Sequence, residues 1–501
     1  MRNILEYLEI TETMYPHQTA VDDQESLFTW KELAEISRKM GTAFAEKTSP
    51  GKPVVIFATK SAITLAAMFG TVYAGGFYVV VDPSQPVKRV QEILNILKPQ
   101  LAVADKRSLK LLKQIDYKGN ICEMEDAMQR REDRDLLQRI REHSRDTDIL
   151  YGIFTSGSTG IPKGIVVSHR SVMDFISHFV EIFNFTVHDR IGNQAPFDFD
   201  VSVKDIYTSM MTGAALIIIP KEMFSTPPLL LDYLCEKKVT TLIWAVSALS
   251  LVATLKGLSY RVPERVKKIL FSGEVMPVKQ LRMWQMALPK AEFVNLYGPT
   301  EITCNCTYYK VQEMFPDGEK IPIGRPFPGR EVFLLDEDQR KIVSPEKVGE
   351  ICVSGESLSE GYYGNLEETR KRFIDYPQED HETKRCYKTG DLGYYGRNGE
   401  LYFSGRKDFQ IKHMGHRIEL EEIERVMEQI AGLERAICLM DEKRNRLVAF
   451  YLGDINPCGI REKMKDKLPD YMIPHKVIKA EVMPLNKNGK TDRNYFRQKL
   501  R

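Results

Sequence analysis

The sequence predicts an α/β fold divided into at least two domains. Its 501 residues exceed what one hydrophobic core usually supports, and 43% of them are hydrophobic. Apolar runs of strand length recur between segments of helical pattern, which is typical of a parallel sheet covered on both faces. These runs are residues 54–57, 101–104, 215–219 and 268–271.

An uncharged stretch at residues 62–81 is long enough to span a bilayer. Gly75 and Gly76 interrupt it, however, and residues 77–81 are rich in residues that favour strands. We therefore expect a helix, a turn and a buried strand here rather than a membrane helix.

The second half of the chain changes in pattern and then forms a separate tail. From about Gly324, shorter strands with glycine-rich turns predict a small β-rich subdomain, at residues 348–353 and 399–403. A compact tail of about ninety residues follows Lys407 and Asp408, enough for an independent small domain. Its first helix is expected at residues 420–430. The apolar face of that helix would hold Ile423, Val426, Met427 and Ile430.

Charge and cysteine content exclude several classes of function. The 71 basic and 69 acidic side chains leave a net charge of +2, so no basic field favours nucleic acid. The eight cysteines include no C-x-x-C pair, which indicates reduced thiols in a cytoplasmic protein. The N-terminus carries acidic residues where a signal peptide needs an apolar run. We expect a monomer without membrane insertion.

A segment rich in glycine and hydroxyl side chains is suited to bind phosphate. It reads Thr155-Ser156-Gly157-Ser158-Thr159-Gly160-Ile161-Pro162-Lys163-Gly164. Glycine permits positive φ and exposes backbone N–H groups, and the hydroxyls add further donors to an anion. The segment is not a Walker A motif, because Gly164 follows Lys163 where that motif has Ser or Thr. Since a flexible turn could have the same composition, other motifs must decide.

Further motifs follow in order over nearly the whole chain. They are Phe28-Thr-Trp-Lys-Glu-Leu33, Tyr297-Gly-Pro-Thr-Glu301, Tyr387-Lys-Thr-Gly-Asp391, Arg406-Lys-Asp-Phe-Gln410, Gly415-His-Arg-Ile-Glu419 and Asn488-Gly-Lys490. With residues 155–164, they make the chain resemble the adenylate-forming enzymes, the superfamily of amino-acid adenylation domains, acyl-CoA ligases and luciferases. Two segments resemble amino-acid adenylation domains in particular, Phe197-Asp-Phe-Asp-Val-Ser202 and Asn488-Gly-Lys-Thr-Asp-Arg493. In length and spacing the chain is similar to stand-alone D-alanine:carrier-protein ligases and to single nonribosomal-peptide adenylation domains.

The resemblance implies both a fold and a reaction. The fold is a large N-terminal domain of two helix-flanked sheets plus a small β subdomain, residues 1–407, and a smaller mobile α+β C-terminal domain, residues 408–501, that turns about Asp408. The reaction uses ATP and Mg²⁺ to join an amino-acid carboxylate to the α-phosphorus. The aminoacyl group then passes to the phosphopantetheine thiol of a separate carrier protein. Because a carboxylic acid has a pKa of about 4, the first step needs alignment and positive charge rather than a general base.

The resemblance also assigns roles to residues that, taken singly, could be helix caps, turns or surface charges. Thr300 would contact the α-phosphate, Glu301 would hold Mg²⁺, and Asp391 would bind the ribose with Arg406 beside it. Lys490 is the expected catalytic residue, because a mobile cation can neutralise the charge that develops. The expected nucleotide contacts are Thr155, Ser156, Gly157, Ser158, Thr159, Gly160, Lys163, Asn295, Leu296, Tyr297, Gly298, Pro299, Thr300, Asp391, Arg406 and Lys490.

Asp200 aligns with the position that pairs with a substrate α-ammonium group, which favours an α-amino acid. Around it, the resemblance places a pocket of Val201, Lys204, Ala245, Leu270, Ser272, Leu296, Cys304 and Asn305. Several of these resemble pockets for small residues, but Lys204 departs from that pattern and would suit a polar or acidic side chain unless it extends outward to solvent. Glycine, serine, alanine and aspartate all remain open. An acyl-CoA ligase and a non-catalytic amino-acid or nucleotide sensor are the alternative functions.

Overall fold

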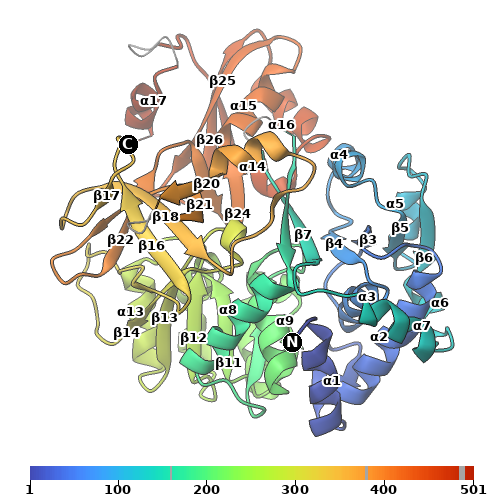
Figure 1. Cartoon of the computed structure of the whole chain (residues 1–501). Helices are drawn as coiled ribbons and strands as arrows, with labels where there is room; N and C mark the ends of the chain where they lie inside the picture. The colour runs from blue at the N-terminus through green and yellow to red at the C-terminus, as the bar shows by residue number, and fades with distance from the viewer. Residues whose placement is uncertain (158–160, 378–381, 485–490, 501) are drawn as a thin grey trace.

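Two mostly parallel sheets, an antiparallel sheet and a smaller C-terminal part make up the computed structural model, which describes residues 1–157, 161–377, 382–484 and 491–500 (Figure 1). Within these ranges the first sheet has nine strands, parallel in its centre and antiparallel at its edges. In spatial order they are β15 (Arg325–Pro326), β14 (Thr307–Val311), β13 (Glu292–Tyr297), β12 (Lys268–Ser272), β11 (Thr241–Ala245), β9 (Arg190–Asn193), β10 (Ala215–Ile218), β1 (Thr19–Asp22) and β2 (Leu27–Thr29).

The second sheet has seven strands among the described residues and is parallel except at one edge. Its order is β19 (Gly361–Tyr362), β8 (Lys163–Ser168), β7 (Ile149–Thr155), β4 (Phe77–Val81), β3 (Pro53–Phe57), β5 (Leu101–Ala104) and β6 (Asn120–Glu123). The runs predicted as strands at residues 54–57, 101–104, 215–219 and 268–271 are confirmed as β3, β5, β10 and β12 to within one residue at each end.

Helices cover both sheets, as the continuous apolar strands predicted. The largest cluster of buried apolar side chains lies between the two sheets, and two further clusters fill their outer faces. The helices of this part are α1 (Leu5–Met14), α2 (Trp30–Ala45), α3 (Ala62–Tyr73), α4 (Val87–Leu97), α5 (Leu109–Leu112), α6 (Met124–Met128), α7 (Arg134–Glu142), α8 (His169–Ile182), α9 (Val201–Thr212), α10 (Pro227–Glu236), α11 (Val246–Thr254), α12 (Gly257–Tyr260), α13 (Val278–Ala287) and α14 (Leu366–Arg372).

The uncharged stretch at residues 62–81 forms helix α3, a turn and strand β4, as predicted. Gly75 makes the turn with a φ of +75°, a conformation that favours glycine. All five residues of β4 are buried. No helix in the described part of the chain is long and apolar enough to cross a membrane.

The β-rich subdomain predicted after Gly324 is also present, as an antiparallel sheet. It packs β17 (Lys341–Ile342), β16 (Arg330–Leu335), β18 (Gly349–Gly355), β21 (Thr383–Tyr395) and β20 (Phe373–Pro377) side by side, with β22 (Leu401–Arg406) also paired to β21.

The C-terminal part has its own cores. It begins with a hairpin of β23 (Gln410–His413) and β24 (His416–Glu419), followed by a sheet of β25 (Leu433–Asp441), β26 (Arg446–Gly453) and β27 (Lys476–Lys479). Two apolar clusters lie wholly after residue 410. The predicted first helix is α15 (Leu420–Glu428), with Ile423 and Met427 buried, and α16 (Pro457–Lys465) and α17 (Arg493–Lys499) complete this part. A boundary at residue 407 stays a prediction.

Candidate active site

Most of the predicted site residues that the structure describes surround one cavity of about 70 Å³. Strands β7, β12 and β13 all end at it, which is where ligands bind in parallel α/β sheets. The predicted residues in its wall are Thr155, Ser156, Asp200, Val201, Lys204, Ser272, Gly298, Pro299, Thr300, Cys304, Asn305, Asp391 and Arg406.

The loop rich in glycine and hydroxyl groups joins β7 to β8. Thr155 ends β7 and pairs with Lys163, which begins β8. Ser156 Oγ donates a hydrogen bond to the backbone carbonyl of Arg417 at 2.7 Å. Lys163 Nζ donates to Glu368 Oε1, also at 2.7 Å, so an ion pair holds this lysine outside the cavity wall. Outside the described residues lie Ser158, Thr159 and Gly160.

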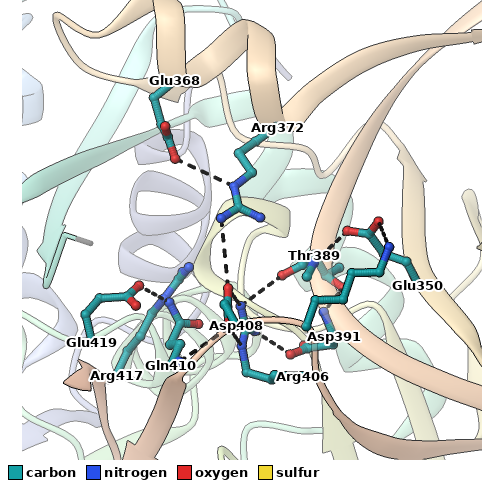
Figure 2. Close-up of polar contacts among 12 residues, drawn as sticks. Glu350, Glu368, Arg372, Thr389, Asp391, Arg406, Asp408, Gln410, Arg417 and Glu419 are labelled. Atoms are coloured by element: carbon teal, nitrogen blue, oxygen red, sulfur yellow. Dashed lines mark hydrogen bonds and ion pairs between the residues drawn. The ribbon is translucent and has the colours of Figure 1, made fainter. Parts of the chain in front are cut away.

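Asp391 is held from two sides. The Tyr297 hydroxyl donates to Asp391 Oδ2 at 2.6 Å, and Arg406 forms an ion pair with Asp391 Oδ1. Arg406 also pairs with Asp408, with 2.5 Å between Nε and Oδ1 (Figure 2). These contacts fix the carboxylate at the cavity wall and leave lone pairs on both of its oxygens, which is what a pair of ribose hydroxyls requires.

Glu301 lies in the 3₁₀ turn η2 (Thr300–Ile302) and is fully buried. Its carboxylate accepts a hydrogen bond from the Tyr362 hydroxyl at 2.7 Å, and Arg417 Nη1 lies 2.8 and 2.9 Å from its two oxygens. Burial alone would raise the pKa of Glu301, but the Arg417 charge and these hydrogen bonds outweigh it and lower the pKa to about 2. The carboxylate is therefore ionised at neutral pH.

The β23–β24 hairpin reaches into the site from the C-terminal part. Its turn residues Met414 and Gly415 have φ of +53° and +81°, as in the tight hairpins that favour glycine. The Gly415 N–H donates to Glu274 Oε1 at 2.8 Å, so the tip of the hairpin contacts the segment that follows β12 of the nine-stranded sheet. Gly415, His416 and Arg417 all line the cavity. The resemblance to adenylate-forming enzymes also implies that residues 415–419 face the active site during thiol transfer, and the hairpin of this structure has three of these residues in the cavity wall.

Part of the predicted amino-acid pocket lies around the start of α9. Asp200 is the residue before this helix, and Lys204 lies one turn further on the same face. Lys204 Nζ donates to Asn305 Oδ1 at 2.9 Å and to Ser272 Oγ at 3.2 Å. Cys304 Sγ donates to the Asp200 carbonyl at 3.1 Å, which ties the opposite wall to the helix.

Some predicted residues lie behind the wall rather than in it. Asn295, expected to contact nucleotide, instead donates from Nδ2 to the Pro322 carbonyl at 2.8 Å. Ser272, the last residue of β12, lines the cavity, whereas Leu270 is buried two residues deeper in the strand. The predicted residues outside the wall are Gly157, Lys163, Ala245, Leu270, Asn295, Leu296, Tyr297, Glu301 and Asp408.

Several wall residues were not predicted as site residues. Phe199 and Gln410 lie inside motifs that the sequence displays, so those motifs could have indicated them. Tyr471 lines the cavity and stacks on His416 with 3.7 Å between ring centroids, but no sequence pattern marks it. Tyr362, which holds Glu301, is equally unmarked.

Lys490, the expected catalytic residue, lies outside the described residues. The nearest described neighbours, Pro484 and Thr491, do not line the cavity. Helix α17 follows shortly afterwards, and its Arg493 donates to the Cys438 carbonyl at 2.8 Å on β25. A rotation that brings Lys490 to the cavity stays a prediction.

The fold and this cavity define a nucleotide-dependent α/β enzyme. A model of the AMP-binding enzyme family matches residues 8–363. The chain therefore belongs to the AMP-binding enzyme family, whose members use ATP.

Curated relatives agree with this assignment, and a solved structure shares the fold. A D-alanine–D-alanyl carrier protein ligase of Bacillus cytotoxicus is 32% identical over 98% of this chain and 98% of its own length. Tyrocidine synthase 1 of Brevibacillus parabrevis is 29% identical over 98% of this chain, which spans 44% of that protein, and most of the other relatives are likewise much longer than this chain. The adenylation domain AlmE of Vibrio cholerae, solved with glycyl-adenosine-5'-phosphate, shares the fold at a TM-score of 0.86 and 22% identity, covering 100% of this chain and 98% of that one.

Proposed function

We propose that this chain uses ATP to activate an amino acid as aminoacyl-AMP and passes the aminoacyl group to the phosphopantetheine thiol of a separate carrier protein. One observation carries the proposal: Asp200 lines the same cavity as Ser156, Thr300 and Asp391. A partner for an α-ammonium group and partners for a nucleotide therefore meet within one small space. The carrier-protein ligase among the relatives supports the acceptor, and we place the reaction in the cytoplasm.

In the first step, an oxygen of the amino-acid carboxylate attacks the α-phosphorus of ATP, the bond to the bridging oxygen breaks, and pyrophosphate leaves. Asp200 holds the ammonium group, and Asp391 orients the ribose. The Thr155–Ser156 loop and Thr300 donate hydrogen bonds to phosphate oxygens. Holding the two reactants in line lowers the entropic part of the barrier, and the donors stabilise the charge that develops.

Mg²⁺ would be held by Glu301 together with phosphate oxygens, where it would neutralise charge on the triphosphate. The residues fit this ion, because the buried Glu301 carboxylate already faces a cation, the Arg417 guanidinium. In the described part of the chain, no cluster of three or more His, Cys, Asp or Glu residues could form a cage. A single carboxylate completed by phosphates and water is an ordinary Mg²⁺ ligand set.

In the second step, the carrier thiolate attacks the aminoacyl carbonyl, a thioester forms, and AMP leaves. The structure has the β23–β24 hairpin at the cavity, which suits this step. Its Ser156–Arg417 and Glu274–Gly415 hydrogen bonds would keep the C-terminal part in place while the thiol enters. Adenylation would use a second pose with Lys490 at the phosphates and Asp408 as the hinge.

Pyrophosphate release tests the proposal. The purified chain is given ATP, Mg²⁺ and each standard amino acid or its D-isomer in turn, and Asp391→Asn serves as the matched variant. We expect release with a narrow set of amino acids and a loss on the order of 100-fold in the variant. Release with none of them, or transfer to free CoA in preference to a carrier protein, would contradict the proposal.

A further inference from the structure

Lys204 is a buried cation whose bonds are all to neutral groups. The residue is 1% exposed, and burial lowers the pKa of its ammonium group. Its two hydrogen bonds go to the Asn305 amide oxygen and the Ser272 hydroxyl. An ammonium group has three N–H donors, so one donor and the positive charge remain for whatever enters the cavity.

The charged groups around Lys204 do not neutralise it. Asp200 lines the same cavity, and in the proposed function it pairs with the α-ammonium group of the substrate. Asp205 accepts a hydrogen bond from Asn193 Nδ2 at 2.6 Å and forms no ion pair with Lys204 among the described residues, and burial raises the pKa of its carboxyl group. Lys412 also lines the cavity and adds a second positive charge. A buried ion without a full counter-ion is costly, so this part of the pocket favours an anionic group on the ligand.

The wall that holds Lys204 is built with some backbone strain. Thr303 and Cys304, just before Asn305, both have positive φ, at +54° and +71°. Such conformations cost free energy in residues other than glycine and persist where the surroundings require them. Gly298 accommodates the turn, because a Cβ there would lie 2.5 Å from the Asn305 Cα. The chain thus fixes the Asn305 oxygen on the Lys204 ammonium group.

We propose that the amino acid this site selects carries a carboxylate at the end of its side chain, with Lys204 as the specificity-determining residue that binds it. This inference rests on the proposed function. Asp200 and Lys204 then bind opposite ends of one substrate: the α-ammonium group and the side-chain carboxylate. Their spacing of one helical turn on α9 sets both contacts from a single rigid element.

Binding and turnover test the inference separately. Aspartate, glutamate, asparagine, glutamine, serine and alanine are titrated calorimetrically into the protein loaded with AMP, and pyrophosphate release is then measured for the same panel. We expect aspartate or glutamate to bind best and to give the highest kcat/KM, ahead of its own amide by about 30-fold or more. Lys204→Met should remove that preference through KM. Lys290→Met should not, because this exposed lysine lies just before the start of β13 and does not line the cavity. Retained AMP binding shows that Lys204→Met still folds.

The outcomes separate the two claims. Preference for serine, alanine or an amide over the matching acid, in binding or in turnover, overturns the inference and leaves amino-acid adenylation standing. If none of the amino acids supports pyrophosphate release, the proposed function is wrong. The binding series then decides the role of Lys204 by itself. If Lys204→Met still prefers the acidic amino acid over its amide to the same degree, the inference is also wrong.

Discussion

Arg417 and Glu301 form an ion pair that joins the C-terminal hairpin to the η2 turn behind the cavity wall, with Nη1 2.8 and 2.9 Å from the two carboxylate oxygens. Glu301 is also the residue assigned to Mg²⁺. One fully buried carboxylate cannot be shared freely between two cations, so the docked hairpin and the metal would use it in turn. The ion pair would therefore link the position of the C-terminal part to the departure of pyrophosphate.

Replacing Arg417 with Gln should slow thiol transfer more than adenylation. The change leaves the buried Glu301 charge without its partner in the docked pose, which costs roughly 2 kcal/mol or more, or about 30-fold. Single-turnover measurement of the two steps checks this. Arg435→Gln, an exposed arginine on β25, is the control and should change neither rate. Equal losses in both steps would show that Arg417 has no special part in docking.

Magnesium pyrophosphate should displace the hairpin. If Mg²⁺ takes the Glu301 carboxylate, the docked pose loses the Arg417 contact and its population falls. One dye is attached to an exposed residue of the N-terminal part and a second to an exposed residue of the C-terminal part. Energy transfer between the dyes then reports the movement of the C-terminal part without any turnover. Pyrophosphate with a chelator in place of Mg²⁺ is the control. A signal that is the same with and without the metal would mean that Glu301 is not the shared residue.

The sequence predicted the positions of the strands and of several site residues better than it predicted the contacts between elements that are far apart in the chain. Continuous apolar runs identify β3 and β5, because a buried parallel strand must be apolar on both faces. Asp200 and Lys204 are indicated by the resemblance and converge on one wall. The Tyr362 hydroxyl that holds Glu301 could not be predicted, since its position depends on the pairing of β19 with β8, two strands far apart in the chain.

The sequence also could not predict which partner each motif residue has in a given conformation. Lys163 was expected at the phosphates, but in this pose it is paired with Glu368 on α14. A motif predicts which side chain serves a reaction, and it does not say in which conformation that side chain is free. For the same reason, the sequence alone could not show that residues 415–417 line the cavity here.

Locking the hinge should separate the two steps. Asp408→Pro fixes φ near −65° and limits rotation, so adenylation should be largely spared and thiol transfer slowed by about tenfold or more. The Asp408 carboxylate also pairs with Arg406, with 2.8 Å from Nη2 to Oδ2, so the substitution removes a contact as well. Asp408→Ala removes that contact without fixing φ and is the matched control. If both variants lose both steps alike, Asp408 acts through Arg406 and not as a hinge.

Lys490→Ala should nearly abolish adenylation and leave the fold intact. Loss of a cation that stabilises the transition state is expected to cost on the order of 100-fold or more. Thiol transfer from aminoacyl-AMP supplied directly should be little changed, because the β23–β24 hairpin lines the cavity in the pose assigned to that step and Lys490 is assigned to adenylation alone. Pyrophosphate exchange and thioester formation are measured on the same preparation. Normal exchange in the variant would remove Lys490 from the mechanism.

Docking of the C-terminal part should weaken as the pH rises from about 4.5 to 7. Glu422 on α15 contacts Arg89 on α4 at 3.0 Å, and both side chains are buried. Burial raises the pKa of Glu422 to about 7, against the opposing effect of Arg89 and with the help of Glu419 and Glu92. Because the pKa of Glu422 is higher in the docked pose, docking takes up a proton. The resulting stabilisation of the docked pose is complete below the ordinary pKa of 4.5 and is lost as the pH rises through 7. It amounts to at most about 3 kcal/mol. Energy transfer between the two parts across this range checks it. Glu422→Gln should flatten the profile, whereas the exposed Glu434→Gln should not; an unchanged slope in Glu422→Gln would assign the effect to another group.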